Sequence, residues 1–318
     1  MKLPHPKAVM DWNHYPNLPY HNKHHTLSFN YDSCPSIEAF WAAIYHDVHY
    51  DPLSTTNEEA AFEVFVKDIS YDPILSSLNV DRIKHLIMST KDHVASIDYT
   101  DRDMIWLHAN DLAYLRETNL SKVIETEYRI FQEYQFVSYD IYRNKRIQIL
   151  TKLRSHSLVS EETVNMIIGY LNGWNPNVGV FCGSFNMMHK GHLAVIHQAE
   201  KIFDKVIVAQ GQNIEKNTNM YDINELDSLK YYEKHQFQGS LFDFLSEKNV
   251  VYPKLSLIRG LRNNDDLEHE SILNNFKNDY INIPSVFFLV ASELRHISSS
   301  AIRQLVKLGK NVDQYIVK

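Results

Sequence analysis

One stretch of sequence decides the fold of the second half of the chain: residues 178–192, which read VGVFCGSFNMMHKGH. Its opening residues are mostly apolar, a run that predicts a buried strand, and Gly183 permits a sharp exit from that strand. A helix is predicted to begin around His189 and His192, with Gly191 between them allowing close approach of the backbone. Because the N-terminus of a helix offers free N–H groups to an anion, this strand, loop and helix predict a phosphate site. Two surface imidazoles are the alternative interpretation of the histidine pair.

Outward from this stretch, the second half alternates between short apolar runs and amphipathic runs. Runs rich in β-branched and aromatic residues predict further strands at 206–209, 255–258 and 286–290. Helical periodicity predicts helices at 193–203, 241–246, 267–276 and 301–308. Such alternation is typical of a parallel sheet covered by helices on both faces. The predicted fold of this half is therefore an α/β Rossmann-like domain.

The first half has a different periodicity. Across residues 36–156 apolar residues recur at helical spacing, including one long helical stretch from 120 to about 154. No run of alternating strand-type residues occurs here, so this half is predicted to be all-α. The turn-rich segment 172–177 separates the two patterns. We therefore predict two domains, a helical one at 1–172 and an α/β one at 177–318.

Composition argues against several classes of protein. With a formal net charge of −7 and no long block of Lys and Arg, the chain is unlike proteins that coat nucleic acid. The longest apolar run, 286–291, is too short to span a membrane. The two cysteines, Cys34 and Cys182, lie in different halves, which argues against a disulfide framework. A cytoplasmic protein without nucleic-acid or membrane partners is expected.

Four further motifs follow in the second half: GSLFDF at 239–244, IRGLR at 258–262, DLEHE at 266–270 and ISSSAIR at 297–303. Taken alone, the serine run predicts only a helix cap, and the arginines predict ion pairs with Asp265 or Asp266. Together with residues 181–192, in the same order and spacing, these motifs resemble phosphopantetheine adenylyltransferase of the nucleotidylyltransferase superfamily. The resemblance covers nearly the whole second half.

This resemblance implies adenylyl transfer from ATP, bound with Mg²⁺, to 4′-phosphopantetheine, which gives dephospho-coenzyme A and pyrophosphate. The residues at the family's catalytic positions are His189, His192, Lys216 and Arg262. Those at its ATP- and substrate-binding positions are Gly183, Ser184, Phe185, Gly191, Arg259, Gly260, Glu270, Ser298, Ser299, Ser300 and Arg303. The family also implies a homo-oligomer.

By the same resemblance, His192 binds the α-phosphate region, and Lys216 bridges the α-phosphate and the acceptor phosphate. Arg259 would hold the acceptor phosphate, while Arg262 and the serine run would hold the β- and γ-phosphates. His189 stands where this family more often has Thr. A histidine at this position resembles the His-x-Gly-His motif of nicotinamide mononucleotide adenylyltransferases. Nicotinamide mononucleotide is therefore the alternative acceptor.

The helical half carries a mixed set of imidazole and carboxylate groups. His46 and Asp47 are adjacent near the end of a predicted helix, with a histidine-rich segment, 20–25, before them and Asp111 after them. Such donors suit Mn²⁺, Fe²⁺, Mg²⁺, Zn²⁺ or Co²⁺, and the ligand types do not choose among these ions. Core residues satisfied by hydrogen bonds are the alternative interpretation.

Five motifs of this half resemble those of HD-superfamily metal-dependent phosphohydrolases: YHNKHH at 20–25, AIYHD at 43–47, NEE at 57–59, TKDH at 90–93 and DL at 111–112. The resemblance implies an HD-type domain with four metal ligands and two accessory groups: His25, His46, Asp47 and Asp111, and then His21 and His93. The chain is then expected to be a bifunctional enzyme that binds ATP, a phosphorylated acceptor and a divalent metal of unknown identity. In the alternative, the first half is a non-catalytic module that senses a nucleotide or a metal.

Overall fold

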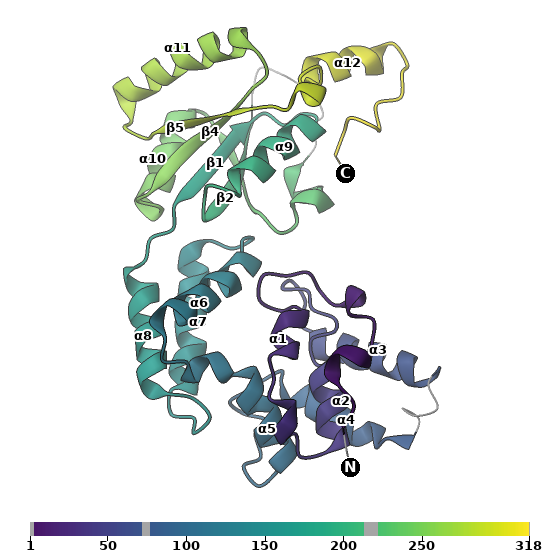
Figure 1. Cartoon of the computed structure of the whole chain (residues 1–318). Helices are drawn as coiled ribbons and strands as arrows, with labels where there is room; N and C mark the ends of the chain where they lie inside the picture. Colours follow the sequence, from purple (N-terminus) through teal and green to yellow (C-terminus); the bar gives the residue numbers. More distant parts are fainter. Residues whose placement is uncertain (1–2, 72–76, 213–221, 318) are drawn as a thin grey trace. The chain divides into compact units, whose positions relative to one another are not determined.

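The computed structural model describes residues 3–71, 77–212 and 222–317, and the chain divides into two compact units (Figure 1). The first unit comprises Met1–Glu133 and Arg143–Gly173, and the second comprises Tyr134–Tyr142 and Trp174–Lys318. The domain ranges 1–172 and 177–318 remain a prediction. Residues Tyr134–Tyr142, which fall within the range predicted for the first domain, belong to the second compact unit. No helix in the described part of the chain is long and apolar enough to cross a membrane.

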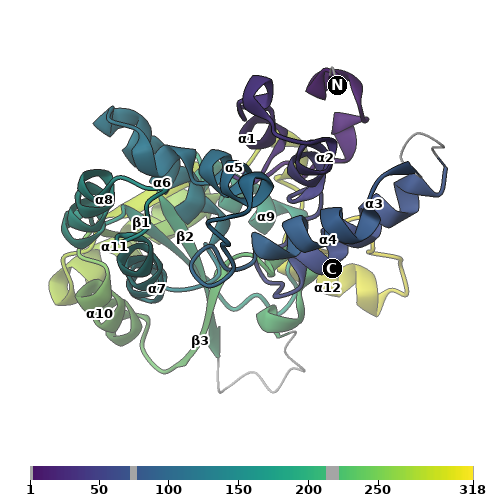
Figure 2. The same ribbon diagram turned by 90° about the horizontal axis from the view of Figure 1, so that it is seen from below.

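The first unit is helical in its described residues. Its helices are α1 (Lys23–Leu27), α2 (Ile37–Tyr45), α3 (Asn57–Ile69), α4 (Val80–Ser89), α5 (Arg102–Asp111), α6 (Leu120–Glu133), α7 (Tyr139–Leu153, which begins in the second unit) and α8 (Glu161–Gly173). The central helix is α2, which packs against α3, α4 and α5, as Figures 1 and 2 show. Ser36 caps α2 by accepting a hydrogen bond from the Ala39 N–H, and almost all of the helix is buried. This burial fixes the two residues that follow the helix, His46 and Asp47.

The second unit is built on a five-stranded parallel sheet with the order β3-β2-β1-β4-β5. The strands are β1 (Val178–Gly183), β2 (Lys205–Gln212), β3 (Glu233–Gln238), β4 (Leu255–Leu261) and β5 (Ser285–Leu289). The helices are α9 (Lys190–Ala199), α10 (Leu241–Val251), α11 (Asn264–Tyr280) and α12 (Ser299–Lys307). In both views α10 and α11 lie together, away from α9, so helices cover both faces of the sheet (Figures 1 and 2). The Rossmann-like α/β architecture predicted from the sequence is therefore present.

The strand order reverses beside β1, because β2 lies on one side of it and β4 on the other. In open parallel sheets this switch point leaves a crevice at the carboxyl ends of the strands, where ligands bind. Gly260 in β4 helps to close this region, since a Cβ there would meet Val195 Cγ2 of α9 at 2.8 Å. The glycine therefore lets α9 pack closely on the sheet.

Four elements differ from the sequence-based expectation, the first being the short helix α1, which was not predicted. Strand β3, with the sequence EKHQFQ, was not predicted, because it is an edge strand with mostly polar side chains. The long helix predicted from 120 to about 154 is wrong: the structure has two helices, α6 and α7, with a break between Glu133 and Tyr139. Helix α8 was also not predicted.

The break between α6 and α7 has a structural reason within the second unit. The buried Lys205 ammonium at the start of β2 donates to the carbonyl oxygens of Gln135 and Val137, the latter at 2.8 Å. The Glu233 N–H of β3 also donates to the Gln135 carbonyl oxygen at 3.0 Å. These bonds hold the segment in a non-helical conformation, which the apolar pattern of the sequence does not encode.

Candidate functional site

A cleft of about 380 Å³ opens at the carboxyl ends of β1 and β4. Twelve of the predicted site residues line it: Gly183, Phe185, His189, Gly191, His192, Arg259, Gly260, Arg262, Glu270, Ser298, Ser299 and Ser300. Ser184 is exposed outside this lining, and Arg303 is an exposed residue that donates to Ser300 Oγ at 3.0 Å. Lys216 lies outside the described residues. The residues in the cleft come from segments far apart in sequence, brought together by the switch point of the sheet.

The two histidines of the H-x-G-H motif stack on each other at the start of α9, with ring centroids 3.6 Å apart. His189 is the N-cap residue, and its N–H donates to His192 Nδ1 at 3.3 Å. Burial lowers the pKa of His189 to about 4 and the pKa of His192 well below its ordinary value, and the nearby Arg262 charge lowers both further. Both rings are therefore neutral near pH 7, and His189 Nδ1 is a buried atom that has no hydrogen-bond partner in the part of the chain that the structure describes. An arriving phosphate would supply the missing partner.

Phe185 supports this histidine pair from the loop after β1. Its φ of 43° lies in the left-handed region, which residues other than glycine rarely adopt. The side chain is almost fully buried, and its ring meets His192 edge-on with centroids 5.2 Å apart. Burial of the aromatic ring offsets the cost of the strained backbone, which is about 1–3 kcal/mol for such a residue. The strained residue, Phe185, thus lies in the loop that was predicted to bind phosphate.

Both arginines of the cleft are held by carboxylates of α11. Arg259 lies 3.0 Å from Glu270 through Nε and donates to the Cys182 carbonyl oxygen at 3.0 Å. Arg262 donates from Nε and Nη2 to the two oxygens of Asp266, each at 2.8 Å. The local ion pair that Arg262 predicted on its own is thus present, in a group that also faces the cleft. Paired in this way, the guanidinium groups keep a fixed orientation toward an incoming anion.

The serine run opens α12 at the cleft. Ser298 is the N-cap residue, and its Oγ accepts a hydrogen bond from the Ala301 N–H at 3.1 Å. The cap predicted by the serine run alone is therefore present, while Ser299 and Ser300 also line the cleft. A helix start directed at this space provides backbone N–H groups and the positive end of the helix dipole. With α9, two helices begin at the same cleft.

A second groove of about 210 Å³ adjoins the first and shares Arg259 and Glu270 with it. Its other lining residues are mostly apolar: Leu241, Phe242, Leu257, Leu273, Asn274, Lys277, Ser285 and Phe287. Lys277 is almost fully buried, and its ammonium donates to the Ile283 carbonyl oxygen and to Ser285 Oγ. The phosphate cleft thus continues into an apolar groove. These groove residues were not predicted from the sequence, and neither were Asp266 and His269 in the cleft.

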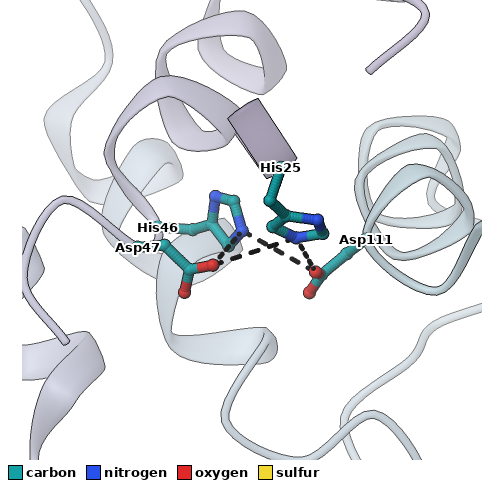
Figure 3. A group of neighbouring side chains, drawn as sticks. All are labelled: His25, His46, Asp47 and Asp111. Carbon is teal, nitrogen blue, oxygen red and sulfur yellow. Dashed lines mark hydrogen bonds and ion pairs between the residues drawn. The ribbon is translucent and has the colours of Figure 1, made fainter. Parts of the chain in front are cut away.

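In the first unit, the four predicted metal ligands come together (Figure 3). His25 comes from α1, His46 and Asp47 follow α2, and Asp111 ends α5. One ligand atom from each lies within 4.8 Å of all the others. His46 Nε2 is 3.1 Å from Asp47 Oδ2, and His25 Nε2 is 2.8 Å from Asp111 Oδ1. The four side chains point toward a common centre, as metal ligands do.

The hydrogen bonds of this cluster are those of a cation site. His46 Nδ1 is 2.8 Å from the Ala43 carbonyl oxygen, an arrangement that turns Nε2 toward the centre. Among the described residues, His46 Nε2 and Asp47 Oδ2 are buried there without hydrogen-bond partners. Burial alone would raise the pKa of Asp111, but the hydrogen bond from His25 and the nearby imidazole of His46 outweigh it and hold that pKa well below its ordinary value. A divalent cation fits this set of donors.

The two accessory histidines have different partners. His21 Nδ1 is 2.6 Å from Glu133 Oε2, and the ring stacks on Tyr50 with centroids 3.6 Å apart. His93 Nε2 is 3.3 Å from Asp111 Oδ2. Glu133 was not predicted as part of the site, because it lies far from His21 in sequence and at the end of an ordinary amphipathic helix.

Comparison with known proteins addresses the second unit. A cytidylyltransferase-like family model matches residues 180–305. Phosphopantetheine adenylyltransferase from Clostridium botulinum (strain Eklund 17B / Type B) is 30% identical over 152 residues, which cover 44% of this chain and 91% of that protein. The phosphopantetheine adenylyltransferase of Clostridium perfringens (strain SM101 / Type A) is 35% identical over 150 residues, or 44% of this chain and 88% of that protein.

The phosphopantetheine adenylyltransferase of Cytophaga hutchinsonii is 33% identical over 150 residues, or 44% of this chain and 95% of that protein. A solved structure from Vibrio parahaemolyticus, provisionally described as a nicotinate-nucleotide adenylyltransferase, has 16% identity and a TM-score of 0.33. It covers 44% of this chain and 86% of its own. The sequence relatives are matched over most of their length, within the region that forms the sheet and the cleft. Through this C-terminal region, the chain belongs to the phosphopantetheine adenylyltransferase family of cytidylyltransferase-like proteins.

Proposed function

We propose that the second unit transfers the adenylyl group of ATP to 4′-phosphopantetheine, forming dephospho-coenzyme A and pyrophosphate. The observation that carries this proposal is the continuity of two spaces: a cleft with phosphate-binding groups and an apolar groove, joined at Arg259 and Glu270. The first space suits the triphosphate of ATP. The second suits the arm of an acceptor whose phosphate must reach the α-phosphorus of ATP.

The residues of the cleft act by binding and orientation. An oxygen of the acceptor phosphate attacks the α-phosphorus, the bond from that phosphorus to the bridging oxygen of the β-phosphate breaks, and pyrophosphate leaves. Neutral His189 and His192 donate hydrogen bonds to the phosphate oxygens, and the α12 N-terminus with Arg262 holds the departing end. Mg²⁺ bound with ATP would neutralise part of the phosphate charge. No covalent intermediate with the protein is required.

The apolar groove favours 4′-phosphopantetheine over nicotinamide mononucleotide. Leu241, Leu273 and Phe287 offer surface that a long, flexible, largely uncharged arm can cover. Nicotinamide mononucleotide is compact and carries a cationic ring, so it would leave this groove unfilled. Arg259 lies at the junction, where it can hold the phosphate of the acceptor.

Pyrophosphate release tests this proposal. The purified chain with ATP and Mg²⁺ should release pyrophosphate with 4′-phosphopantetheine and not with nicotinamide mononucleotide, and the reverse result would overturn the acceptor. His192→Ala should lower kcat by about 100-fold or more, because a group that stabilises the reacting phosphate is removed. His197→Ala, an exposed histidine on the same helix, is the matched control. Undiminished turnover in His192→Ala would remove the assigned role of the histidine pair.

We also propose that the first unit is a metal-dependent phosphohydrolase of HD type. The buried, unpartnered His46 Nε2 and Asp47 Oδ2 support this role, because a cation between them would satisfy both atoms. A divalent metal held by His25, His46, Asp47 and Asp111 would supply Lewis-acid activation of a phosphoryl group and of water. His21, fixed by Glu133, faces the same region and would bind substrate phosphate. A homo-oligomeric, cytoplasmic enzyme with two activities remains the prediction.

Metal content and phosphoester turnover test this second function. The purified chain should hold a divalent metal and release phosphate from phosphoesters, and Asp47→Ala should abolish both. Asp81→Ala, an exposed carboxylate of α4, is the control and should change neither. Metal binding without turnover of any phosphoester, together with an effect of bound metal or nucleotide on pyrophosphate release, would instead establish a sensing module.

A further inference from the structure

A chain of hydrogen-bonding side chains extends from Asp111 away from the metal ligands. Asp111 Oδ2 lies 3.3 Å from His93 Nε2, and His93 Nδ1 lies 2.9 Å from His108 Nδ1. His108 Nε2 lies 2.9 Å from Ser89 Oγ, which in turn is 2.6 Å from the Leu86 carbonyl oxygen. The two imidazole rings are perpendicular, with centroids 4.9 Å apart. No catalytic or metal role described above uses His108 or Ser89.

The direction of each hydrogen bond in this chain follows from its far end. A carbonyl oxygen only accepts, so the Ser89 hydroxyl proton goes to Leu86, and Ser89 Oγ must accept from His108 Nε2. His108 has no accessible surface, and among the described residues its hydrogen-bond partners are the uncharged Ser89 hydroxyl and His93, so burial favours its neutral form. His108 Nδ1 is then an acceptor. His93 Nδ1 must therefore carry a proton and donate it to His108.

This order fixes which atom His93 presents to Asp111. With the proton on Nδ1, the neutral ring has a lone pair on Nε2, facing the Asp111 Oδ2 acceptor at 3.3 Å. Two acceptors so placed need a positive charge or a proton between them. Metal-ligating histidines characteristically donate their other ring N–H to a fixed partner, and the link from His93 to His108 has this form.

His93 Nε2 lies outside the first group of ligand atoms. His93 does not belong to the set whose ligand atoms all lie within 4.8 Å of one another. Asp111 uses Oδ1 toward His25 in that set and Oδ2 toward His93. Ligand bonds of about 2.1 Å meeting at a right or tetrahedral angle place two donor atoms about 3.0–3.4 Å apart. The observed 3.3 Å falls within this span.

We propose a second divalent-cation position between His93 Nε2 and Asp111 Oδ2, with the Asp111 carboxylate bridging it to the first ion. The proposal rests on the metal centre proposed above for the first unit. Among the described residues, His93 and Asp111 are the pair that faces this position, so water or the oxygens of a phosphoester would complete its coordination. The second ion is therefore bound more weakly than the first, and its binding is strengthened by a phosphate-bearing ligand. Two ions about 3.5–4 Å apart would hold a phosphoryl group between them.

Titration of the metal-free full chain with Mn²⁺, followed by electron paramagnetic resonance, tests this position. The wild type should bind two equivalents, the second more weakly, and the second should produce the spin coupling of neighbouring Mn²⁺ ions. His93→Ala and His93→Gln should both keep the first equivalent and lose the second together with the coupling. His85→Gln, an exposed histidine of α4, is the matched control and should bind as the wild type does. Inorganic phosphate should tighten the second equivalent in the wild type and have no such effect in the His93 variants.

The possible failures are distinct. A wild type that binds one uncoupled equivalent, or His93 variants that still bind two, would overturn the second position and leave the first centre standing. A wild type that binds no Mn²⁺ would overturn both. Circular dichroism of the two His93 variants establishes that they are folded, and retention of the first equivalent shows that the remaining ligands are in place.

Discussion

Replacement of His189 by Gln should make the stability of the second unit less sensitive to acid. Burial lowers the pKa of His189 to about 4, compared with 6.5 for the free side chain. Between these two values the unfolded chain binds a proton that the folded chain does not, so stability falls as the pH decreases from about 6.5 toward 4. Above about pH 6.5 the ring is mostly neutral in both states, so this loss of stability disappears. His189→Gln removes the titration and keeps a polar side chain of similar reach.

The size of the effect follows from the two pKa values. At pH 5 the unfolded state is favoured by a factor of about 30 relative to a state in which the histidine is always neutral, or about 2 kcal/mol. At pH 7 the corresponding factor is only about 1.3, or about 0.2 kcal/mol. The His189 ring is 5% exposed but borders an open cleft, so solvent screening reduces the expected difference to about 1 kcal/mol.

Urea unfolding of both proteins at pH 7 and pH 5 measures this difference. The transition of the second unit is the one that moves on addition of ATP, because a ligand stabilises only the unit that binds it. The wild type should lose about 1 kcal/mol more than His189→Gln between the two pH values. Equal losses in the two proteins would refute a buried, neutral His189, and with it the account of how the cleft receives phosphate.

Three further predictions follow from the same structure. Glu233→Gln should destabilise the second unit by about 3–5 kcal/mol in urea unfolding, because the buried Lys205 ammonium, 3.1 Å from Glu233, would keep its carbonyl acceptors and lose the carboxylate that balances its charge; an effect below 1 kcal/mol would show that the pair is not buried in solution. Gly260→Ala should cost about 1–3 kcal/mol, since its Cβ would meet Val195 at 2.8 Å, and an unchanged urea midpoint would contradict this packing. Dialysis against a chelator should lower the melting temperature of the first unit in calorimetry, and Mn²⁺ should restore it. At 100 times its dissociation constant, Mn²⁺ should add about 2.7 kcal/mol to the free energy of unfolding of this unit. An unchanged melting temperature would contradict a bound metal.

The phosphate cleft was predictable because its signals are local or short-range in sequence. The apolar run that forms β1, the glycine at its end and the histidines that open α9 occur within residues 178–192 and appear in the structure in the expected order. The serines that open α12 and the arginines in and just after β4 could be placed because each belongs to a short motif at the end of a predicted element. In a parallel sheet these ends meet at one edge, so the order of elements was enough to bring them together.

The features that were not predictable depend on partners distant in sequence. Strand β3 has a polar sequence and is recognised only through its pairing with β2. The break between α6 and α7 depends on Lys205, a residue of the sheet of the second unit, to which the break itself also belongs. An apolar pattern records which face of an element is buried and contains no information about such side-chain contacts with the backbone.

The histidines of the first unit show the same division between residue type and orientation. Three histidines at the proposed metal centre engage Nδ1 with a partner: His21 with Glu133, His46 with the Ala43 carbonyl oxygen, and His93 with His108. In each ring the engaged Nδ1 leaves Nε2 as the remaining donor or ligand atom, and for His46 and His93 that atom faces the carboxylates Asp47 and Asp111. The sequence supplies the imidazoles and their approximate place on helices. The partner of Nδ1 determines whether a ring can bind a cation, and two of the three partners are side chains that the sequence motifs did not mark. A search for metal sites in helical proteins of this kind should therefore weigh the Nδ1 partners together with the ligands themselves.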